Sequence, residues 1–268
     1  MPDVRNTTTR PSIVQRAGVR VALVGLLAIG FLWHASGRGG ETATPLPPPA
    51  LDNPKAAGEM QTAVLAGGCF WGVQGVYQHT KGVKQVLSGY SGGERERAHY
   101  EQVGTGTTGH AESVQIVFDP REISYGEILR IYFSVAHDPT QLNRQGPDFG
   151  SQYRSAIFYA DPSQQRIAQA YVAQLERAHV FPQPIVTRID PLKGFYPAEA
   201  YHQDFLIRHP DHPYILINDL PKIENLKRLL PQDYREKPVM TYEVLGLKGE
   251  TASPKSDPAI PPGSEASA

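Results

Sequence analysis

Apolar and polar positions follow strand and helix periods only between residues 61 and 247 of this 268-residue chain. Runs of strand length are predicted at 62–66, 83–90, 111–118 and 155–159, and a further extended segment at 184–189. In 111–118 the apolar residues Val114, Ile116 and Phe118 recur at every second position, so they share one face of the strand.

Helices are predicted between and after these strands. A Gly-Gly break at 67–68 is followed by a helical apolar stripe over 70–77. Ser124 and Glu127 form a capping box that begins a helix, and Asp161 before a proline begins another that continues to about residue 178. Further helical segments are predicted at 198–208 and 221–230. Strands and helices alternate irregularly, which favours an α+β fold over a doubly wound parallel sheet.

The first 37 residues have the pattern of a targeting segment. Four arginines precede an uncharged run at 21–37 with an apolar centre at 21–33. This stretch is shorter than the ~20 residues of a spanning helix and fits a signal-peptide core, so a cleaved signal peptide and a retained membrane anchor both stay open. Either one predicts an exported, periplasmic or extracytoplasmic protein that meets the membrane only through this segment. The alternative, a buried amphipathic helix, lacks a polar face.

Proline-rich segments flank the predicted domain. Residues 38–60 contain five prolines and no hydrophobic period, which predicts a semi-rigid linker. Residues 248–268 contain four more prolines among small residues, which predicts a disordered tail. One folded domain is therefore expected, at 61–247.

Composition narrows the possible chemistry. The chain has 26 Lys and Arg against 27 Asp and Glu, a net charge of -1, which excludes a broad basic surface for nucleic acid. Its single cysteine, Cys69, excludes an intrachain disulfide and every multi-thiolate metal or iron–sulfur site. Cys69 is then either a small buried hydrophobe or a reactive thiol.

The surroundings of Cys69 favour the reactive thiol. It lies in the sequence GGCFWG at 67–72, between a predicted strand and a predicted helix. Glycines allow a substrate to approach the backbone, and a helix N-terminus favours a thiolate. We therefore expect an exposed sulfur with a lowered pKa, beside Phe70 and Trp71 as either core residues or pocket walls.

Glu112 is a candidate proton donor. It shares the predicted buried face of Val114 and Ile116, where desolvation would raise its pKa and keep it protonated. An ordinary exposed glutamate at a strand end is the alternative.

The long polar loop at 138–154 has neither a helical nor a strand period. Such loops in compact domains either carry functional residues or are solvated turns, and we favour a functional site.

Dispersed motifs over about 62–206 resemble, in order, the A-type peptide-methionine (S)-S-oxide reductases. They are GGCFWG at 67–72, GYSGG at 89–93, YE at 100–101, GHAE at 109–112, NRQG at 143–146, QYRS at 152–155, FYPAE at 195–199 and YHQ at 201–203. The resemblance implies a two-layer α/β roll with a ferredoxin-like core, preceded here by the short signal or anchor helix. It also implies roles for seven residues: Cys69 as nucleophile, Phe70 and Trp71 as the pocket for the substrate methyl group, Glu112 as acid, Tyr100 and Tyr153 as hydroxyl donors, and Asp148 as a holder of the substrate or the site.

The implied reaction needs no metal or flavin. A sulfoxide sulfur becomes electrophilic when its oxygen takes a proton, so a thiolate, a neutral acid and two phenols form a coherent set. Oxygen passes to Cys69 as a sulfenic acid and methionine is released, from oxidised proteins or from free methionine sulfoxide. The resemblance also implies a monomer that repairs oxidatively damaged proteins.

The chain departs from the family pattern at two points. Family members commonly carry further cysteines that resolve the sulfenic acid, whereas this chain has one cysteine, so an external thiol is expected, a thioredoxin-like protein or a small dithiol. Gln74 stands where an acidic residue is frequent in the family. We interpret this difference as an adjustment of the enzyme and not as a loss of its activity.

Two other functions are compatible with the residues alone. A cysteine hydrolase would use Cys69 with His110 or His137 as base and Asp138 as the orienting group. An exported binding module would hold apolar ligands on Phe70 and Trp71 without catalysis. Cys69→Ser would spare the binding module and abolish reductase activity, and an amide-hydrolysis assay against a methionine-sulfoxide assay separates the hydrolase from the reductase.

Overall fold

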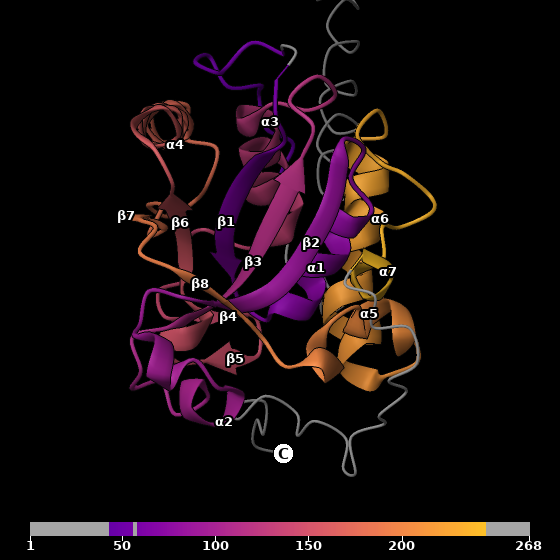
Figure 1. Ribbon diagram of the computed structural model, residues 1–268. Helices are drawn as coiled ribbons and strands as arrows, with labels where there is room; N and C mark the ends of the chain where they lie inside the picture. Colours follow the sequence, from indigo (N-terminus) through magenta and orange to yellow (C-terminus); the bar gives the residue numbers. More distant parts are fainter. Residues whose placement is uncertain (1–42, 56–57, 245–268) are drawn as a thin grey trace, which may run out of the picture. The chain divides into compact units, whose positions relative to one another are not determined.

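Six strands form one mixed sheet in the order β7-β6-β1-β3-β2-β8 (Figure 1). The computed structural model describes residues 43–55 and 58–244; the predicted targeting segment 1–37 and tail 248–268 lie outside them. Neighbouring strands are antiparallel except β6 and β7, which are parallel. The strands are β1 (Gln61–Gly67), β2 (Val83–Ser91), β3 (Ala111–Phe118), β6 (Ser155–Tyr159), β7 (Arg188–Pro191) and β8 (Phe195–Pro197).

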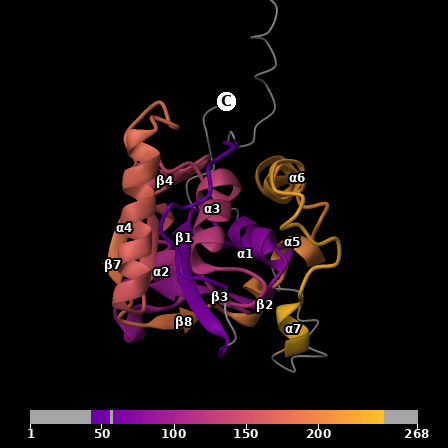
Figure 2. The same cartoon turned by 90° about the horizontal axis from the view of Figure 1, so that it is seen from above.

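Helices cover one face of this sheet. The helices of the molecule are α1 (Phe70–Gln78), α2 (Tyr100–Val103), α3 (Tyr125–Ile131), α4 (Pro162–Arg177), α5 (Phe205–Arg208), α6 (Leu220–Leu229) and α7 (Thr241–Val244). Among them, α2 lies at one end of the sheet, not on this face (Figure 1). Helix α1 packs on β1, β2 and β3, and α4 packs on β6 and β7 beside α3 (Figure 2). Along β1, Ala63 and Leu65 belong to the main core, whereas Val64 and Ala66 belong to a small second cluster on the opposite face.

Most predicted elements are confirmed. Strands β3 and β6 coincide with the predicted segments 111–118 and 155–159. The capping box at the start of α3 is present: the Glu127 N–H donates to Ser124 Oγ at 3.2 Å, and the Ser124 N–H donates to Glu127 Oε2 at 2.8 Å. Asp161 caps α4. The α+β class is therefore confirmed.

The helix predicted at 198–208 is broken in the structure. A 3-10 turn at Ala200–His202 and helix α5 are separated by Asp204, which has a φ of 55°. The cause lies at Gln203, whose side chain turns into the sheet: its Oε1 accepts from the Ser88 N–H and its Nε2 donates to Ser88 O, both at 2.9 Å. These two hydrogen bonds hold Gln203 against β2, so the chain does not continue as the helix that the local sequence predicts. The extended segment predicted at 184–189 becomes strand only from Arg188, where pairing with β6 begins.

Residues 43–55, which fall in the predicted linker, form a strap over α3 and α4. Leu46 in this strap is 4% exposed and belongs to the main core. A proline-rich extended backbone has no internal hydrogen bonds, so its carbonyls are free to accept bonds from the helices. The bonds that hold the strap include Thr44 N–H to Ser134 O, Arg130 Nε to Leu46 O, Tyr171 OH to Pro47 O, Gln174 Nε2 to Pro48 O and Gly126 N–H to Asp52 Oδ1.

Leu46→Ala should lower the free energy of unfolding by about 2–4 kcal/mol, because it leaves a cavity between the strap and the helices. Urea denaturation measures the effect. Leu51, in the same strap, is 47% exposed, so Leu51→Ala should change stability by no more than about 0.5 kcal/mol. Equal losses in the two variants would mean that the strap is not packed as described.

Several chain segments meet at one end of the sheet. The pairs Gly67 with Ser155 and Tyr90 with Glu112 bring the ends of β1 and β2 beside the starts of β6 and β3. The loop 138–154 lies at this same end in Figure 1, where it contains a two-stranded hairpin of β4 (Arg144–Gln145) and β5 (Asp148–Phe149). Residues from distant parts of the sequence are thereby placed around Cys69.

Candidate active site

Cys69 is the N-cap residue of α1 and is 3% exposed. The preceding Gly68 has a φ of 87°, and a Cβ there would overlap the side chain of Gln145. A Cβ on Gly72 would overlap the carboxyl group of Asp219. The glycines around Cys69 thus make room for protein side chains rather than for solvent, and the expectation of an exposed sulfur is wrong.

The expectation of a lowered thiol pKa is also wrong for the substrate-free protein. Burial raises the pKa of Cys69 well above its ordinary value, and the carboxyl groups of Asp219, Glu112 and Asp148 raise it further. The Trp71 N–H at the start of α1 acts in the opposite direction but does not outweigh them. Cys69 therefore rests as a neutral thiol.

Glu112 lies on β3 against the first turn of α1. Its Oε2 accepts a hydrogen bond from the Phe70 N–H at 3.1 Å, and its side chain is buried. Burial raises the pKa of Glu112 to about 8, against the lowering effect of the Phe70 N–H, and the charge of Asp148 adds to the increase. The predicted burial is confirmed and the exposed alternative is wrong. At neutral pH this carboxyl group holds a proton that it can donate.

Two tyrosines of the predicted site, Tyr100 and Tyr153, lie close enough to Glu112 and Cys69 for these groups to influence them. Tyr153 is buried, and its hydroxyl has no hydrogen-bond partner within the described part of the chain. Tyr100, at the start of α2, is partly buried with its ring 4.4 Å from that of His202. Burial is the main cause that raises the pKa of each phenol, and repulsion from Glu112 and Cys69 in their ionised forms raises both further. Both hydroxyls are therefore neutral and able to donate a hydrogen bond.

Phe70 and Trp71 begin α1 directly after Cys69 and form an aromatic wall with neighbouring rings. The Trp71 ring stacks on Phe205 at 3.9 Å, and its Nε1–H donates to His202 Nδ1 at 3.1 Å. The Phe70 ring lies 5.0 Å from that of His202. Both residues are 1% exposed, so they belong to the core.

Asp148 on β5 accepts a hydrogen bond from the Tyr214 hydroxyl through Oδ2. Burial raises its pKa to about 6, although that hydrogen bond and the charge of Lys222 lower it. Its other oxygen, Oδ1, is buried without a hydrogen-bond partner among residues 43–55 and 58–244. One acceptor of Asp148 is thus available to a bound molecule.

The structure adds four residues that the sequence patterns did not assign to the site. These are His202, Tyr214, Asp219 and Lys222. His202 falls in the YHQ segment, but nothing in the pattern assigns it a role. Asp219 precedes a Leu-Pro pair at the start of α6 and has the sequence of a simple helix cap, yet its side chain makes no capping hydrogen bond.

Gln74 lies in the packing between α1 and β2. Its Nε2 donates to Val86 O and Gln203 Oε1, and its Oε1 accepts from the Asp204 N–H. An acidic side chain could not make the two donations, so the amide fits this position.

The histidines proposed for a hydrolase have other partners. His110 Nδ1 accepts from the Gly93 N–H at 3.2 Å, and its Nε2 lies 2.9 Å from Glu94 O. Burial lowers the pKa of His137 to about 3, and its Nδ1 lies 3.0 Å from Tyr132 O. The charges that act on Cys69 come from carboxyl groups and from neither histidine. The geometry gives a cysteine hydrolase no support.

No group of three or more His, Cys, Asp and Glu side chains in residues 43–55 and 58–244 could hold a metal ion. Over the same residues, no helix has the length and apolar character needed to cross a bilayer.

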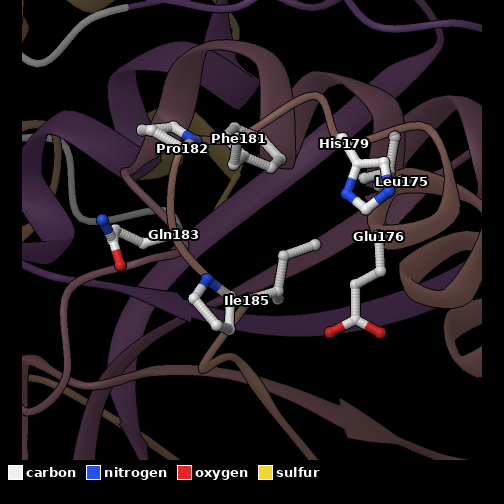
Figure 3. Close-up of a pocket in the computed structure, with 8 residues that line it drawn as sticks. Leu175, Glu176, His179, Phe181, Pro182, Gln183 and Ile185 are labelled. Carbon is white, nitrogen blue, oxygen red and sulfur yellow. The ribbon is translucent and has the colours of Figure 1, made fainter.

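A separate hollow of about 340 Å³ lies at the C-terminal end of α4 (Figure 3). Its lining includes Leu175, His179, Phe181 and Ile185. None of the residues predicted for the site lines it, so the hollow is distinct from the surroundings of Cys69.

The similarity of this chain to known proteins identifies its family. The family model described as peptide methionine sulfoxide reductase matches residues 61–234. The chain belongs to this family. A relative from Mesorhizobium japonicum, named peptide methionine sulfoxide reductase MsrA 2, is 61% identical over 186 residues, which cover 69% of this chain and 95% of the relative. One of the same name from a Synechocystis species is 51% identical, over 72% of this chain and 89% of that protein.

Solved structures agree with this assignment. Mxr1 from Saccharomyces cerevisiae in its reduced form has a TM-score of 0.52 and 30% identity, over 61% of this chain and 92% of that one. Methionine sulfoxide reductase A of Corynebacterium diphtheriae has a TM-score of 0.50 and 34% identity, over 63% and 85%. Because the relatives carry the A-type name, the predicted A-type methionine sulfoxide reductase is confirmed, with oxidoreductase as its enzyme class.

Proposed function

We propose that this enzyme reduces the S epimer of methionine sulfoxide, in proteins and as the free amino acid, with Cys69 as the nucleophile. One observation carries the proposal: the chain's single thiol, a buried acid with a pKa of about 8 and two neutral phenols meet at one end of the sheet. The enzyme repairs oxidised proteins as a monomer.

Three substituents of the substrate sulfur have separate places. The methyl group lies against the aromatic wall of Phe70 and Trp71. The oxygen lies where Tyr153, Tyr100 and Glu112 can donate to it. The remainder of the substrate extends toward Asp148, whose unpaired Oδ1 accepts an N–H from it.

The first half of the reaction transfers oxygen to Cys69. The Cys69 thiol loses its proton as its sulfur attacks the sulfoxide sulfur, and Glu112 gives a proton to the oxygen while the phenols stabilise the charge that develops there. The proton lost by the thiol returns Glu112 to its neutral form. The oxygen passes to Cys69, which becomes a sulfenic acid. The substrate sulfur is reduced by two electrons and leaves as methionine, and the Cys69 sulfur is oxidised by two.

The second half requires two thiols from outside the chain. One attacks the sulfenic acid, forms a mixed disulfide with Cys69 and releases water. The second attacks that disulfide, restores the Cys69 thiol and leaves the reductant as a disulfide. A thioredoxin-like protein or a small dithiol supplies both thiols, and no prosthetic cofactor takes part.

The N-terminal sequence supports an exported location. The arginines ahead of the apolar run at 21–33 favour translocation of everything after Gly37, with the segment either removed or retained as an anchor. Cell fractionation with an antibody against the catalytic domain tests this location, and recovery in the cytoplasm would reject it.

Only the S epimer of a methionine sulfoxide peptide should be reduced, because separate positions for the methyl group and the oxygen accept only one configuration at the sulfur. Chromatographic separation of the two epimers after incubation with dithiothreitol measures this. Equal consumption of both epimers would contradict the assigned pocket. Cys69→Ser is the control, and it should consume neither.

A further inference from the structure

The carboxylate of Asp219 lies over the first turn of α1, next to the nucleophile. Asp219 is fully buried and ends the π-helical turn Ile215–Asp219. Its carboxyl group occupies the space that a side chain at Gly72 would fill, three residues after Cys69. Gly72 therefore allows a negative group to approach the helix end that begins at Cys69.

Lys222 accompanies this carboxylate inside the protein. Its Nζ lies 3.6 Å from Asp219 Oδ1, and the two side chains are 7% and 0% exposed. An ion pair buried to this degree carries a large desolvation cost and is weak evidence of added stability. Its position next to a reacting sulfur suggests an electrostatic role.

Several charged or polar groups near Cys69 favour or disfavour its thiolate form. The start of α1 contributes the positive end of a helix, which favours a thiolate. Other groups near the site in the described part of the chain include Glu112 from β3, Asp148 from β5, Asp219 with Lys222 at the start of α6, His202, and the neutral phenols Tyr100, Tyr153 and Tyr214. Asp219 has the largest effect of the three carboxyl groups on the pKa of Cys69.

We propose that Asp219 and Lys222 are positioning residues for the Cys69 proton: the Asp219 carboxylate keeps the proton on the sulfur in the substrate-free enzyme, and Lys222 limits this effect. The inference rests on the proposed role of Cys69 as nucleophile. A protonated resting thiol benefits the enzyme because the chain has only one cysteine. A thiolate attacks hydrogen peroxide, releases hydroxide and becomes a sulfenic acid, which a second peroxide converts to sulfinic acid. This chain has no second cysteine that could intercept the sulfenic acid, so a protonated resting sulfur slows a damaging side reaction.

Alkylation by iodoacetamide without substrate tests the pair. Because the chain has one cysteine, each added mass in the intact protein reports Cys69. The rate follows the thiolate fraction, so Asp219→Asn should alkylate about tenfold faster than wild type at pH 8, which corresponds to a pKa lower by about one unit. Lys222→Met should alkylate several-fold more slowly at pH 9. Opposite changes in the alkylation rate of the two variants indicate a charge effect. A general loss of packing around Cys69 would instead accelerate alkylation in both variants.

The exposed ion pair of Lys227 and Glu236, at 3.4 Å, supplies matched controls. Lys227→Met and Glu236→Gln should leave the alkylation rate within twofold of wild type. An unchanged rate in Asp219→Asn, or faster alkylation in Lys222→Met, would overturn the proposal. If Asp219→Asn does not fold, as judged by thermal unfolding, Lys222→Met decides alone. Since no substrate is present, the outcome is independent of whether methionine sulfoxide is reduced.

Discussion

Glu112→Gln is expected to slow the sulfoxide-reduction step by roughly 10²–10⁴-fold, because glutamine keeps the shape and removes the transferable proton. A single-turnover assay with a methionine sulfoxide peptide and no reductant measures this step alone. Glu122→Gln, on the exposed surface beside Lys84, is the control and should stay within twofold of wild type. A Glu112→Gln rate within a few-fold of wild type would assign the proton to Tyr100 or Tyr153.

The same substitution should change the pH dependence of stability. The folded-state pKa of about 8 exceeds the ordinary value of 4.5, so the contribution of Glu112 to stability is fully present below about pH 4.5 and is lost as the pH rises toward 8. Glutamine does not titrate. Relative to wild type, Glu112→Gln should therefore gain about 3 kcal/mol between pH 5 and pH 8. Urea denaturation at the two pH values measures the gain, and a constant difference would contradict the buried neutral acid.

A single turnover without reductant should release one methionine per chain and leave a sulfenic acid on Cys69. Because there is no second cysteine, no intramolecular disulfide can form. Dimedone traps the sulfenic acid, and intact-mass spectrometry detects the adduct. Cys69→Ser should release no methionine and give no adduct. Stoichiometric methionine without an adduct would show that the oxygen leaves by a different route.

The sequence predicts those parts of the molecule in which neighbours along the chain decide the outcome. Alternation of apolar residues is enough to place Glu112 on the buried face of β3, and the Ser124 and Glu127 pair is enough to begin α3. These features depend on residues two to four positions apart, so the pattern records them directly.

The pattern does not record contacts between distant segments. Gln145 and Asp219 fill the space above Gly68 and Gly72, and both come from later parts of the chain. The sequence therefore predicted an exposed thiolate where the structure has a buried thiol among carboxyl groups. Gln203 is a similar case, since its bonds to Ser88 break a helix that its own neighbours favour.

The strap at 43–55 determines where the protein can be shortened. The family match begins at residue 61, and this boundary would appear to be the natural start of a recombinant fragment. Such a fragment would lose Leu46 from the core and leave the Tyr171 hydroxyl without its acceptor at Pro47. The newly exposed apolar surface between α3 and α4 would favour aggregation. A fragment that begins at or before Ala43 retains the strap, and its yield of soluble protein should be the higher of the two.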